Sequence, residues 1–424
     1  MKWEYVRLGD VCSKIGSGAT PKGGAKVYID DGTSLIRSQN VYNLEFSYGG
    51  LAHITENAAK KLNGVTVQKN DVLINITGDS VARTCIVPDN VLPARVNQHV
   101  AIVRPNSDVL NPSFLNYYLA SPYMQSFMLG LAIGKGASRN AMTKDMIANF
   151  YVLCPPIDIQ KLIVNKLSAY DNLIENNKKQ IKLLEEAAQR LYKEWFVDLR
   201  FPGHEITAIV DGVPEGWTKV PLSELISYEI GGGWGEESPT AKNIKEAYVI
   251  RGTDLSGITH GDYLSIPYRF HTESNLLSRN LIDGDIVFEV SGGSRTEGVA
   301  RCLLITSEML DVWRNNVMCA SFCKLIRPKN GYSYYLHDCF KYMRATGKTE
   351  EYDKRSASSI VNYRWKDFLA QELLLDPSSK ILEQYSNYSR SIYYKLVECS
   401  LQISSAKIAR DSLLPKLMSG EIEV

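Results

Sequence analysis

The chain has 424 residues, of which 44% are hydrophobic, 22% charged and 10% aromatic. This length exceeds one ordinary domain, and the composition excludes a disordered, collagen-like or low-complexity chain. With 48 Lys plus Arg against 47 Asp plus Glu, the formal net charge is +1. That balance argues against a general polyanion binder but leaves a local basic patch open.

The first predicted segment, residues 1–155, consists of short alternating apolar runs separated by Gly, Asn, Asp and Pro. Such runs, for example 71–76, predict strands joined by turns, and a helix is expected near 112–130. We therefore expect a globular domain of mixed α/β structure.

Residues 156–201 predict one long helix. The stretch 159–198 contains neither Pro nor Gly, and such a helix would be a rod of about 60 Å. Mostly apolar side chains recur along it at heptad spacing, and the seam positions are Leu167, Ile174, Asn177, Ile181, Leu184 and Leu191. This pattern is typical of a coiled coil, in which Asn177 would fix the register at some cost in stability.

Residues 202–376 predict a second globular domain, with a strand at 285–290 and a helix near 332–345. Residues 377–424 predict a second long helix. Its seam includes Leu396, Cys399 and Ile403 and is interrupted by Ser389 and Arg410.

The two halves of the chain align when the sequence is moved by 214 positions. Matching positions include Trp3 with Trp217, Gly18 with Gly232, Arg37 with Arg251 and Asp71 with Asp285; Arg83 matches Arg301 after a four-residue insertion, and Arg104 matches Arg327 at a similar later offset. This common register indicates an internal duplication and an α+β fold with two globular halves. Each long helix could lie on its own half, but two such helices at equivalent positions favour pairing with each other.

The eight cysteines are scattered without a C-x-x-C pair, and Met1–Glu4 leads into polar sequence without an apolar signal core. No apolar run reaches the length of about 18 residues that a membrane span needs. These features predict a reduced, cytoplasmic protein.

Motifs of catalysis are weak in this sequence. Gly134–Gly136 lacks the spacing of a phosphate-binding loop, and Gly16–Pro21 has Pro where a dinucleotide fingerprint has its third Gly. Asn111–Phe114 is similar to the box of adenine methyltransferases, but a helix cap by Asn111 is the better interpretation. Cys319 and Cys323, together with His337 and Cys339, have poor spacing for zinc and no equivalent in the first half, so buried strand cysteines are the better interpretation. No catalytic or metal-binding residue is predicted.

Four stretches resemble the specificity (S) subunits of type I DNA restriction–modification systems, and the likeness extends over the whole chain. They are 3–11 (WEYVRLGDV), 154–160 (CPPIDIQ), 191–198 (LYKEWFVD) and 413–422 (LLPKLMSGEI). The chain departs from the family at 376–379 (DPSS), where the second helix usually begins with Pro-Pro, an acidic residue and Gln.

The resemblance implies that residues 1–155 and 202–376 are target-recognition domains, each reading one half of a split DNA site. The helices of 156–201 and 377–424 would form an antiparallel coiled coil that sets the distance between them. Two adenine-N6 methyltransferase subunits carrying S-adenosylmethionine would dock on the chain, and restriction motor–nuclease subunits would join the complex. The chain itself would be non-catalytic, without a cofactor, and would serve phage defence.

The charge is unevenly distributed between the halves. Residues 1–155 have 15 basic and 11 acidic side chains (15 − 11 = +4), whereas residues 202–376 have 19 and 24 (19 − 24 = −5). A DNA reader with a net charge of −5 must concentrate its cations on one face or rely on partner subunits for phosphate neutralisation.

Candidate base-reading residues are polar or cationic side chains on predicted loops. In the first half they are Lys135, Ser138, Arg139 and Asn140, followed by Thr20, Lys22 and Arg37. In the second half they are Lys348, Arg355 and Ser356, followed by Trp234, Arg251 and Arg295. For each residue, a solvated loop or a structural salt bridge is an equally good interpretation.

Three other functions are compared with these features. A recognition subunit of the same kind in another phage-defence methyltransferase assembly would have the same features. A non-DNA coiled-coil adaptor would fit the repeat but not the sequences that flank the helices. A self-contained DNA methyltransferase would need a cofactor loop and a catalytic box, which the chain lacks.

Overall fold

The computed structural model describes residues 3–133, 141–292, 298–355 and 360–422. The chain divides into two compact units. Unit 1 contains Met1–Asn172 and Lys407–Val424, and unit 2 contains Leu173–Ala406. Each unit therefore combines one globular half with a part of both long helices.

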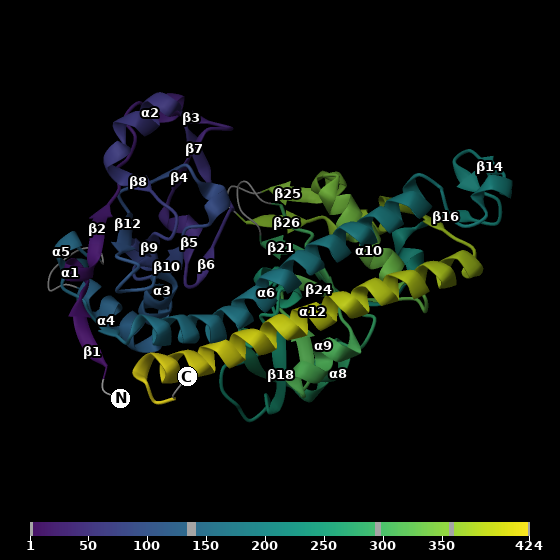
Figure 1. The fold of residues 1–424 in the computed structure, drawn as a ribbon. Coiled ribbons are helices and arrows are strands. Elements are labelled where there is room, and N and C mark those ends of the chain that lie inside the picture. The colour runs from purple at the N-terminus through teal and green to yellow at the C-terminus, as the bar shows by residue number, and fades with distance from the viewer. Residues whose placement is uncertain (1–2, 134–140, 293–297, 356–359, 423–424) are drawn as a thin grey trace. The chain divides into compact units, whose positions relative to one another are not determined.

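Unit 1 has two larger sheets and, beside them, the two-stranded sheets β1-β13 and β5-β6 (Figure 1). The antiparallel four-stranded sheet has the order β10-β9-β12-β2, and the mixed five-stranded sheet has the order β3-β7-β4-β11-β8. The strands are β1 (Glu4–Arg7), β2 (Cys12–Ser17), β3 (Tyr28–Ile29), β4 (Thr33–Ile36), β5 (Val41–Tyr42), β6 (Glu45–Phe46), β7 (Ala52–Ile54), β8 (Thr66–Val67), β9 (Val72–Asn75), β10 (Thr84–Ile86), β11 (Ala94–Val96), β12 (Val100–Pro105) and β13 (Tyr151–Cys154). The helices are α1 (Leu8–Val11), α2 (Glu56–Lys61), α3 (Pro112–Ala120), α4 (Pro122–Ala132), α5 (Lys144–Ala148) and α6 (Ile157–Tyr192).

The core of unit 1 includes the end of the chain. Ile163 and Leu167 of α6 and Leu414 and Leu417 of α12 (Ser379–Ser419) belong to one buried cluster with side chains of β9, β12, α3 and α4. Because this apolar surface is removed from water only when both helices are in place, the C-terminal residues stabilise the N-terminal half.

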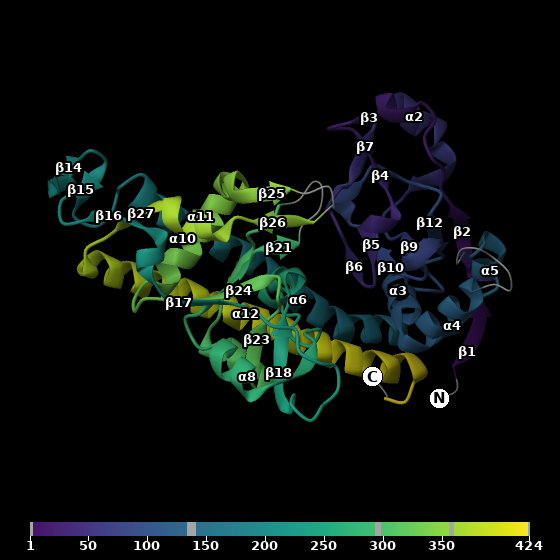
Figure 2. The same ribbon diagram turned by 180° about the vertical axis from the view of Figure 1, so that it is seen from behind.

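Unit 2 has the same plan (Figure 2). Its four-stranded sheet has the order β17-β24-β20-β22, and a three-stranded sheet has the order β19-β18-β23. The strands are β14 (Ile209–Val210), β15 (Val213–Pro214), β16 (Thr218–Pro221), β17 (Ile226–Gly231), β18 (Lys245–Ile250), β19 (Tyr268–His271), β20 (Ile286–Glu289), β21 (Ser291–Gly292), β22 (Cys302–Leu304), β23 (Val317–Cys319), β24 (Cys323–Pro328), β25 (Asp353–Arg355), β26 (Val361–Tyr363) and β27 (Leu373–Asp376). The helices, besides α12, are α7 (Leu255–Thr259), α8 (Glu273–Arg279), α9 (Ser307–Trp313), α10 (Ser333–Ala345) and α11 (Trp365–Gln371).

The duplication predicted from the sequence is confirmed by strand order and direction. Strands β2, β9, β10 and β12 correspond to β17, β20, β22 and β24, and both sets are joined in the same antiparallel order. In each unit a further strand, β4 or β18, pairs parallel with its neighbour β11 or β23.

Two pairs of aligned residues form the same buried ion pair. In unit 1, Arg104 Nε lies 2.6 Å from Asp71 Oδ1; in unit 2, Arg327 Nε lies 2.8 Å from Asp285 Oδ1. Each guanidinium also contacts the second carboxylate oxygen, and both carboxylates are fully buried. Burial of a charge is tolerated because the bidentate partner and its hydrogen bonds replace water.

The aligned glycines Gly18 and Gly232 are explained by a close approach of two backbones. A Cβ added at Gly18 would lie 1.8 Å from the carbonyl oxygen of Val96. At Gly232 it would lie 2.2 Å from the carbonyl oxygen of Ala320. A side chain at either position would force the backbone apart, so only glycine fits.

The long helices α6 and α12 pair in opposite directions within each unit (Figure 1). In unit 1, Arg410 Nη1 lies 2.6 Å from Asp171 Oδ1. In unit 2, Asn177 donates a hydrogen bond to Gln402 at 3.1 Å, and Cys399 contacts Gln180 at 3.8 Å. Residue numbers rise along α6 as they fall along α12, so the pair is antiparallel.

Most of the predicted seam residues lose their contact with water. The buried ones are Leu167, Ile174, Asn177, Ile181, Leu396, Cys399 and Ile403, and the half-buried ones are Leu184 and Leu191. The two polar interruptions of the second seam have acidic partners. Arg410 pairs with Asp171, and Ser389 lies 3.5 Å from Asp338 of α10, which also accepts a hydrogen bond from Tyr385 at 2.6 Å.

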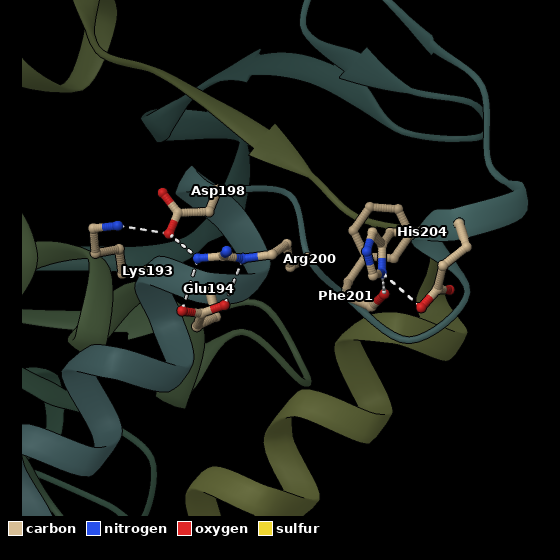
Figure 3. Close-up of polar contacts among 7 residues, drawn as sticks. Lys193, Glu194, Asp198, Arg200, Phe201 and His204 are labelled. Atoms are coloured by element: carbon tan, nitrogen blue, oxygen red, sulfur yellow. Dashed lines mark hydrogen bonds and ion pairs between the residues drawn. The ribbon is translucent and has the colours of Figure 1, made fainter.

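Charged side chains form ion pairs with one another at the end of α6 (Figure 3). The helix continues as a π-helical turn, Lys193–Val197, and Arg200 then reaches back to Glu194 at 2.7 Å and to Asp198 at 2.9 Å. Lys193 lies 2.6 Å from the same Asp198 carboxylate, and the Lys193 hydrogen bond lowers the pKa of that carboxyl. These contacts join the residues that follow the helix to its last turn, in the sequence 191–198 that resembles the family.

The helix expected near 112–130 is two helices, α3 and α4. Ser121 caps the second one by accepting from the backbone N–H of Met124, and Pro122 occupies its first turn. Since Pro disfavours helical geometry in the residue before it, the helix breaks at Ser121. The cap by Asn111 at the start of α3 is confirmed, because its side chain accepts from the N–H groups of Ser113 and Phe114.

We predict that Arg327→Met lowers the free energy of unfolding by about 3 kcal/mol, because it leaves the buried Asp285 carboxylate without a counter-charge. Urea denaturation of the full chain measures the loss. Lys329→Met removes an exposed cation that has no ion pair among the described residues, and it should change the value by less than about 0.5 kcal/mol. The double variant Asp285→Asn with Arg327→Met should recover part of the loss; no recovery would contradict this explanation.

Candidate nucleic-acid interface

Each globular half contains an open cavity at the same place in the repeat. The first has a volume of about 530 Å³, and its lining includes Ser38, Gln39, Tyr42, Thr77, Arg83 and His99. The second has a volume of about 620 Å³, and its lining includes Trp234, Arg251, Thr253, Ser291, Arg301 and Phe322. We call them the first and the second cavity.

The two cavities are formed by corresponding loops. Gln39 and Thr253 follow β4 and β18, and Thr77 and Ser291 follow β9 and β20. Arg83 and Arg301 precede β10 and β22, and each comes after an alanine with a positive φ, 74° at Ala82 and 70° at Ala300. The loops leave the ends of rigid strands, an arrangement that commonly carries binding residues.

The linings differ in their chemistry. The first cavity has Tyr42 and His99 beside hydroxyl and amide groups, whereas the second has Trp234 and Phe322. Aromatic faces and polar side chains on loops are the groups that contact bases in protein–nucleic acid complexes.

The two cavities also differ in the charge that lies next to their arginines. Arg301 Nη2 lies 2.6 Å from Glu289 Oε1, and Nε lies 2.8 Å from Oε2, so this guanidinium is held by a bidentate carboxylate. In the first half, the position equivalent to Glu289 is occupied by Asn75. The amide of Asn75 donates to the carbonyl groups of Ser38 and Val41. Arg83 therefore has a neutral neighbour where Arg301 has a charged one.

Next to the cavities, a second carboxylate of the second half is replaced by an asparagine in the first half. Arg251 pairs with Asp254 at 2.7 Å, and this hydrogen bond raises the pKa of Arg251. The corresponding residues are Arg37 and Asn40; Arg37 Nη2 donates to the carbonyl oxygen of Gly50 at 2.6 Å. Two asparagines in the first half thus stand where the second half has carboxylates.

The structure brings together some of the candidate residues predicted from the sequence. Trp234 and Arg251 line the second cavity, and Trp234 is 39% exposed with the Arg269 guanidinium 4.7 Å above its ring. Arg37 lies beside the first cavity without lining it. Thr20 and Lys22 are exposed on the loop after β2, where Thr20 hydrogen-bonds Gln98.

Other candidates have internal partners or lie elsewhere. Lys348 pairs with Glu351 at 3.0 Å, a contact that raises the pKa of the lysine, and it also lies 3.8 Å from Glu372. Arg355 lies 3.8 Å from Asp353 at the end of β25. The candidates outside the described residues are Lys135, Ser138, Arg139, Asn140, Arg295 and Ser356.

Sequence reasoning missed Arg83 and Arg301 as candidates, although it used both as markers of the repeat. It also missed Gln39, Tyr42 and Phe322. The signal that could have found the arginines is their position, because each follows a Val-Ala pair just after a predicted turn. Which side chain faces a cavity depends on the tertiary fold.

Of the four residues in the weak zinc pattern, Cys319 and Cys323 are strand residues, whereas His337 and Cys339 lie in α10. Cys319 ends β23 and Cys323 begins β24, and both are fully buried. Burial raises the pKa of the Cys319 thiol to about 12. Among the described residues there is no group of three or more potential ligands, and no described helix is long and apolar enough to cross a membrane.

Comparison with known proteins gives a consistent result. Residues 1–186 match the family model described as type I restriction modification DNA specificity domain. The MjaIX specificity subunit of a type I restriction enzyme from Methanocaldococcus jannaschii is 24% identical over 430 residues, which cover all of this chain and 94% of that relative. The EcoBI specificity subunit from Escherichia coli is 29% identical over 150 residues, covering 35% of this chain and 31% of its own.

A solved structure has the same fold. The crystal structure of the type I restriction–modification system S subunit from M. genitalium aligns with a TM-score of 0.55 and 13% sequence identity. The alignment covers 98% of this chain and 96% of that one. At this identity the similarity extends to the fold and not to individual residues.

Proposed function

We propose that the chain is a type I restriction–modification specificity subunit, the family to which residues 1–186 and the MjaIX relative are similar, and that it reads a split DNA target with one globular half on each part. Residues 1–155 and 202–376 are the two target-recognition domains in this proposal. The segments 156–201 and 377–424 supply the helices between them. The chain is the non-catalytic specificity subunit of its complex.

The observation that carries the proposal is the pair of corresponding cavities. A duplicated fold with the same loops at both sites can contact two DNA segments, and different linings let the two sites prefer different bases. Two linked contacts also raise the overall affinity, since the second binds at a high effective concentration.

The lengths and mutual contacts of α6 and α12 are suited to a spacer between the two globular halves. They are 36 and 41 residues long, which corresponds to about 54 and 62 Å of helix. The contacts Arg410–Asp171 and Asn177–Gln402 disfavour sliding of one helix along the other, because sliding would leave polar groups in the seam unpaired.

The partners in this proposal are double-stranded DNA, two adenine-N6 methyltransferase subunits and restriction motor–nuclease subunits, all in the cytoplasm. S-adenosylmethionine belongs to the methyltransferase subunits. The second globular half has a net charge of −5 over residues 202–376, from 19 basic and 24 acidic side chains (19 − 24). Tight DNA binding therefore depends on cations from the partner subunits.

The proposal is tested by co-expressing the chain with the adenine methyltransferase subunit encoded beside it and mapping modified adenines by long-read sequencing. We expect the two proteins to purify together and the modified sites to form a bipartite motif with a fixed gap. Co-expression of the methyltransferase alone is the control and should give no such motif. A continuous motif, or no modification and no co-purifying partner, would contradict the proposal.

The spacer role predicts a change in the gap. We would insert a seven-residue helical stretch between Asn177 and Gln180 and a matching one between Cys399 and Gln402, so that the seam keeps its register. Each insertion adds about 10 Å of helix, or about three base pairs of DNA. Methylation mapping should show the same two half-sites with a gap longer by about three base pairs.

The control carries the insertion in α6 alone, which displaces the seam contacts and should lower the melting temperature. If the matched variant folds and still modifies only sites with the original gap, the helices do not set the spacing.

A further inference from the structure

Arg83 and Arg301 occupy the same position in the two cavities but have different partners. We propose that Arg83 contacts DNA directly, donating paired hydrogen bonds to a phosphate or to the edge of a guanine, whereas Arg301 is held by Glu289 and maintains the fold. This inference rests on the proposed function, and it names one residue and the chemistry of its ligand in the first half-site.

The geometry of Arg83 leaves its hydrogen-bonding edge available. The guanidinium carbon lies 4.6 Å from the centre of the Tyr42 ring, so the group is supported on one face by a cation–π contact. Both residues line the first cavity, and Tyr42 is 43% exposed. Among the described residues, no carboxylate forms an ion pair with Arg83.

Stacking of this kind prepares an arginine for recognition. The ring holds the guanidinium plane, and the N–H groups at the edge of that plane remain free to donate. Two parallel donors match the two oxygens of a phosphate or the O6 and N7 atoms of guanine. Asp79 also lines the cavity but is exposed, so its charge is largely screened by water.

In the second half the arginine edge is not available, because Glu289 stands where the first half has Asn75. Glu289 is only 2% exposed and contacts Nε and Nη2 of Arg301 with both carboxylate oxygens. A DNA acceptor would have to displace a buried carboxylate from this fork, which would then remain unpaired at a high cost. In the first half Asn75 has no charge to offer, and its amide already donates to backbone carbonyls.

The equivalent arginines Arg37 and Arg251, next to the cavities, differ in the same way as Arg83 and Arg301. Asp254 accepts from both the Nε and the Nη2 of Arg251, whereas Arg37 donates to a neutral backbone carbonyl. Both exchanges, Asn40 for Asp254 and Asn75 for Glu289, make the first site more positive. The first half is therefore expected to supply more of the phosphate attraction than the second.

The test uses the complex of the full chain with its methyltransferase subunits and a duplex that contains the mapped split target. Binding is measured over a range of salt concentrations, and on duplexes in which each base pair of the first half-site is replaced in turn. The variants are Arg83→Gln, Arg83→Lys and Glu289→Gln. Thermal unfolding of each chain, together with Arg301→Gln, monitors the fold.

Two outcomes support the inference and separate its two ligands. If Arg83 binds a phosphate, Arg83→Gln weakens binding to all sequences and lowers the slope of log affinity against log salt by about one, and Arg83→Lys restores much of it. If Arg83 binds guanine, Arg83→Gln relaxes the preference at one base pair of the first half-site about tenfold or more, and Arg83→Lys restores less of it.

Glu289→Gln gives an independent check, because it removes the charge that holds Arg301 and keeps the shape of the side chain. We expect the salt slope to become steeper by up to about one. Arg301→Gln should lower the melting temperature by several degrees, since it leaves Glu289 unpaired, whereas Arg83→Gln should leave the melting temperature unchanged.

Unchanged affinity, salt slope and base preference in a folded Arg83→Gln complex would overturn the inference. So would a loss of melting temperature in Arg83→Gln as large as that in Arg301→Gln, because Arg83 would then also serve the fold. A wild-type complex that does not distinguish the split target from unrelated DNA would instead contradict the proposed function itself.

Discussion

The bidentate ion pair at the centre of each half is the interaction on which the rest of that half depends. Asp71 precedes β9 and Arg104 belongs to β12, so the pair fixes the antiparallel register of the two central strands at one end. The cavity loops leave these strands at the other end, at Thr77 and His99. The same holds for Asp285 and Arg327 in the second half. A slip of one residue would turn every side chain of β9 or β20 to the opposite face.

Much of this architecture could be predicted from the sequence, because backbone constraints leave strong local signals. Gly18 and Gly232 aligned since no other residue fits against the facing carbonyl, and the long helices were visible in their heptad spacing. The site was harder to predict. Arg83 and Arg301 look alike in the sequence, and their difference depends on Asn75 and Glu289, which lie several residues earlier on a neighbouring strand. Reasoning from the sequence also favoured long polar loops and therefore placed Lys348 among the leading candidates. In the structure the charge of this lysine is neutralised by glutamates.

The duplicated fold has thus diverged more in charge than in shape. Both halves keep the strand order, the buried ion pair, the glycine contact and a cavity of similar volume. The second half has carboxylates beside its arginines, and its cavity has Trp234 and Phe322 where the first has Tyr42 and His99. The net charge of +1 for the whole chain is therefore an average over two sites with different electrostatics, and long-range attraction to DNA is expected mainly from the first.

The central claim, that each cavity reads one half-site, is tested most directly by photo-crosslinking from matched positions. Gln39 and Thr253 are exposed, line the two cavities and are equivalent in the repeat. A photoreactive amino acid at either position, in the assembled complex on its split target, would mark the nearest nucleotides. The account predicts that position 39 crosslinks to one half-site and position 253 to the other. Crosslinks from both positions to the same half-site, or to the gap between the half-sites, would contradict it.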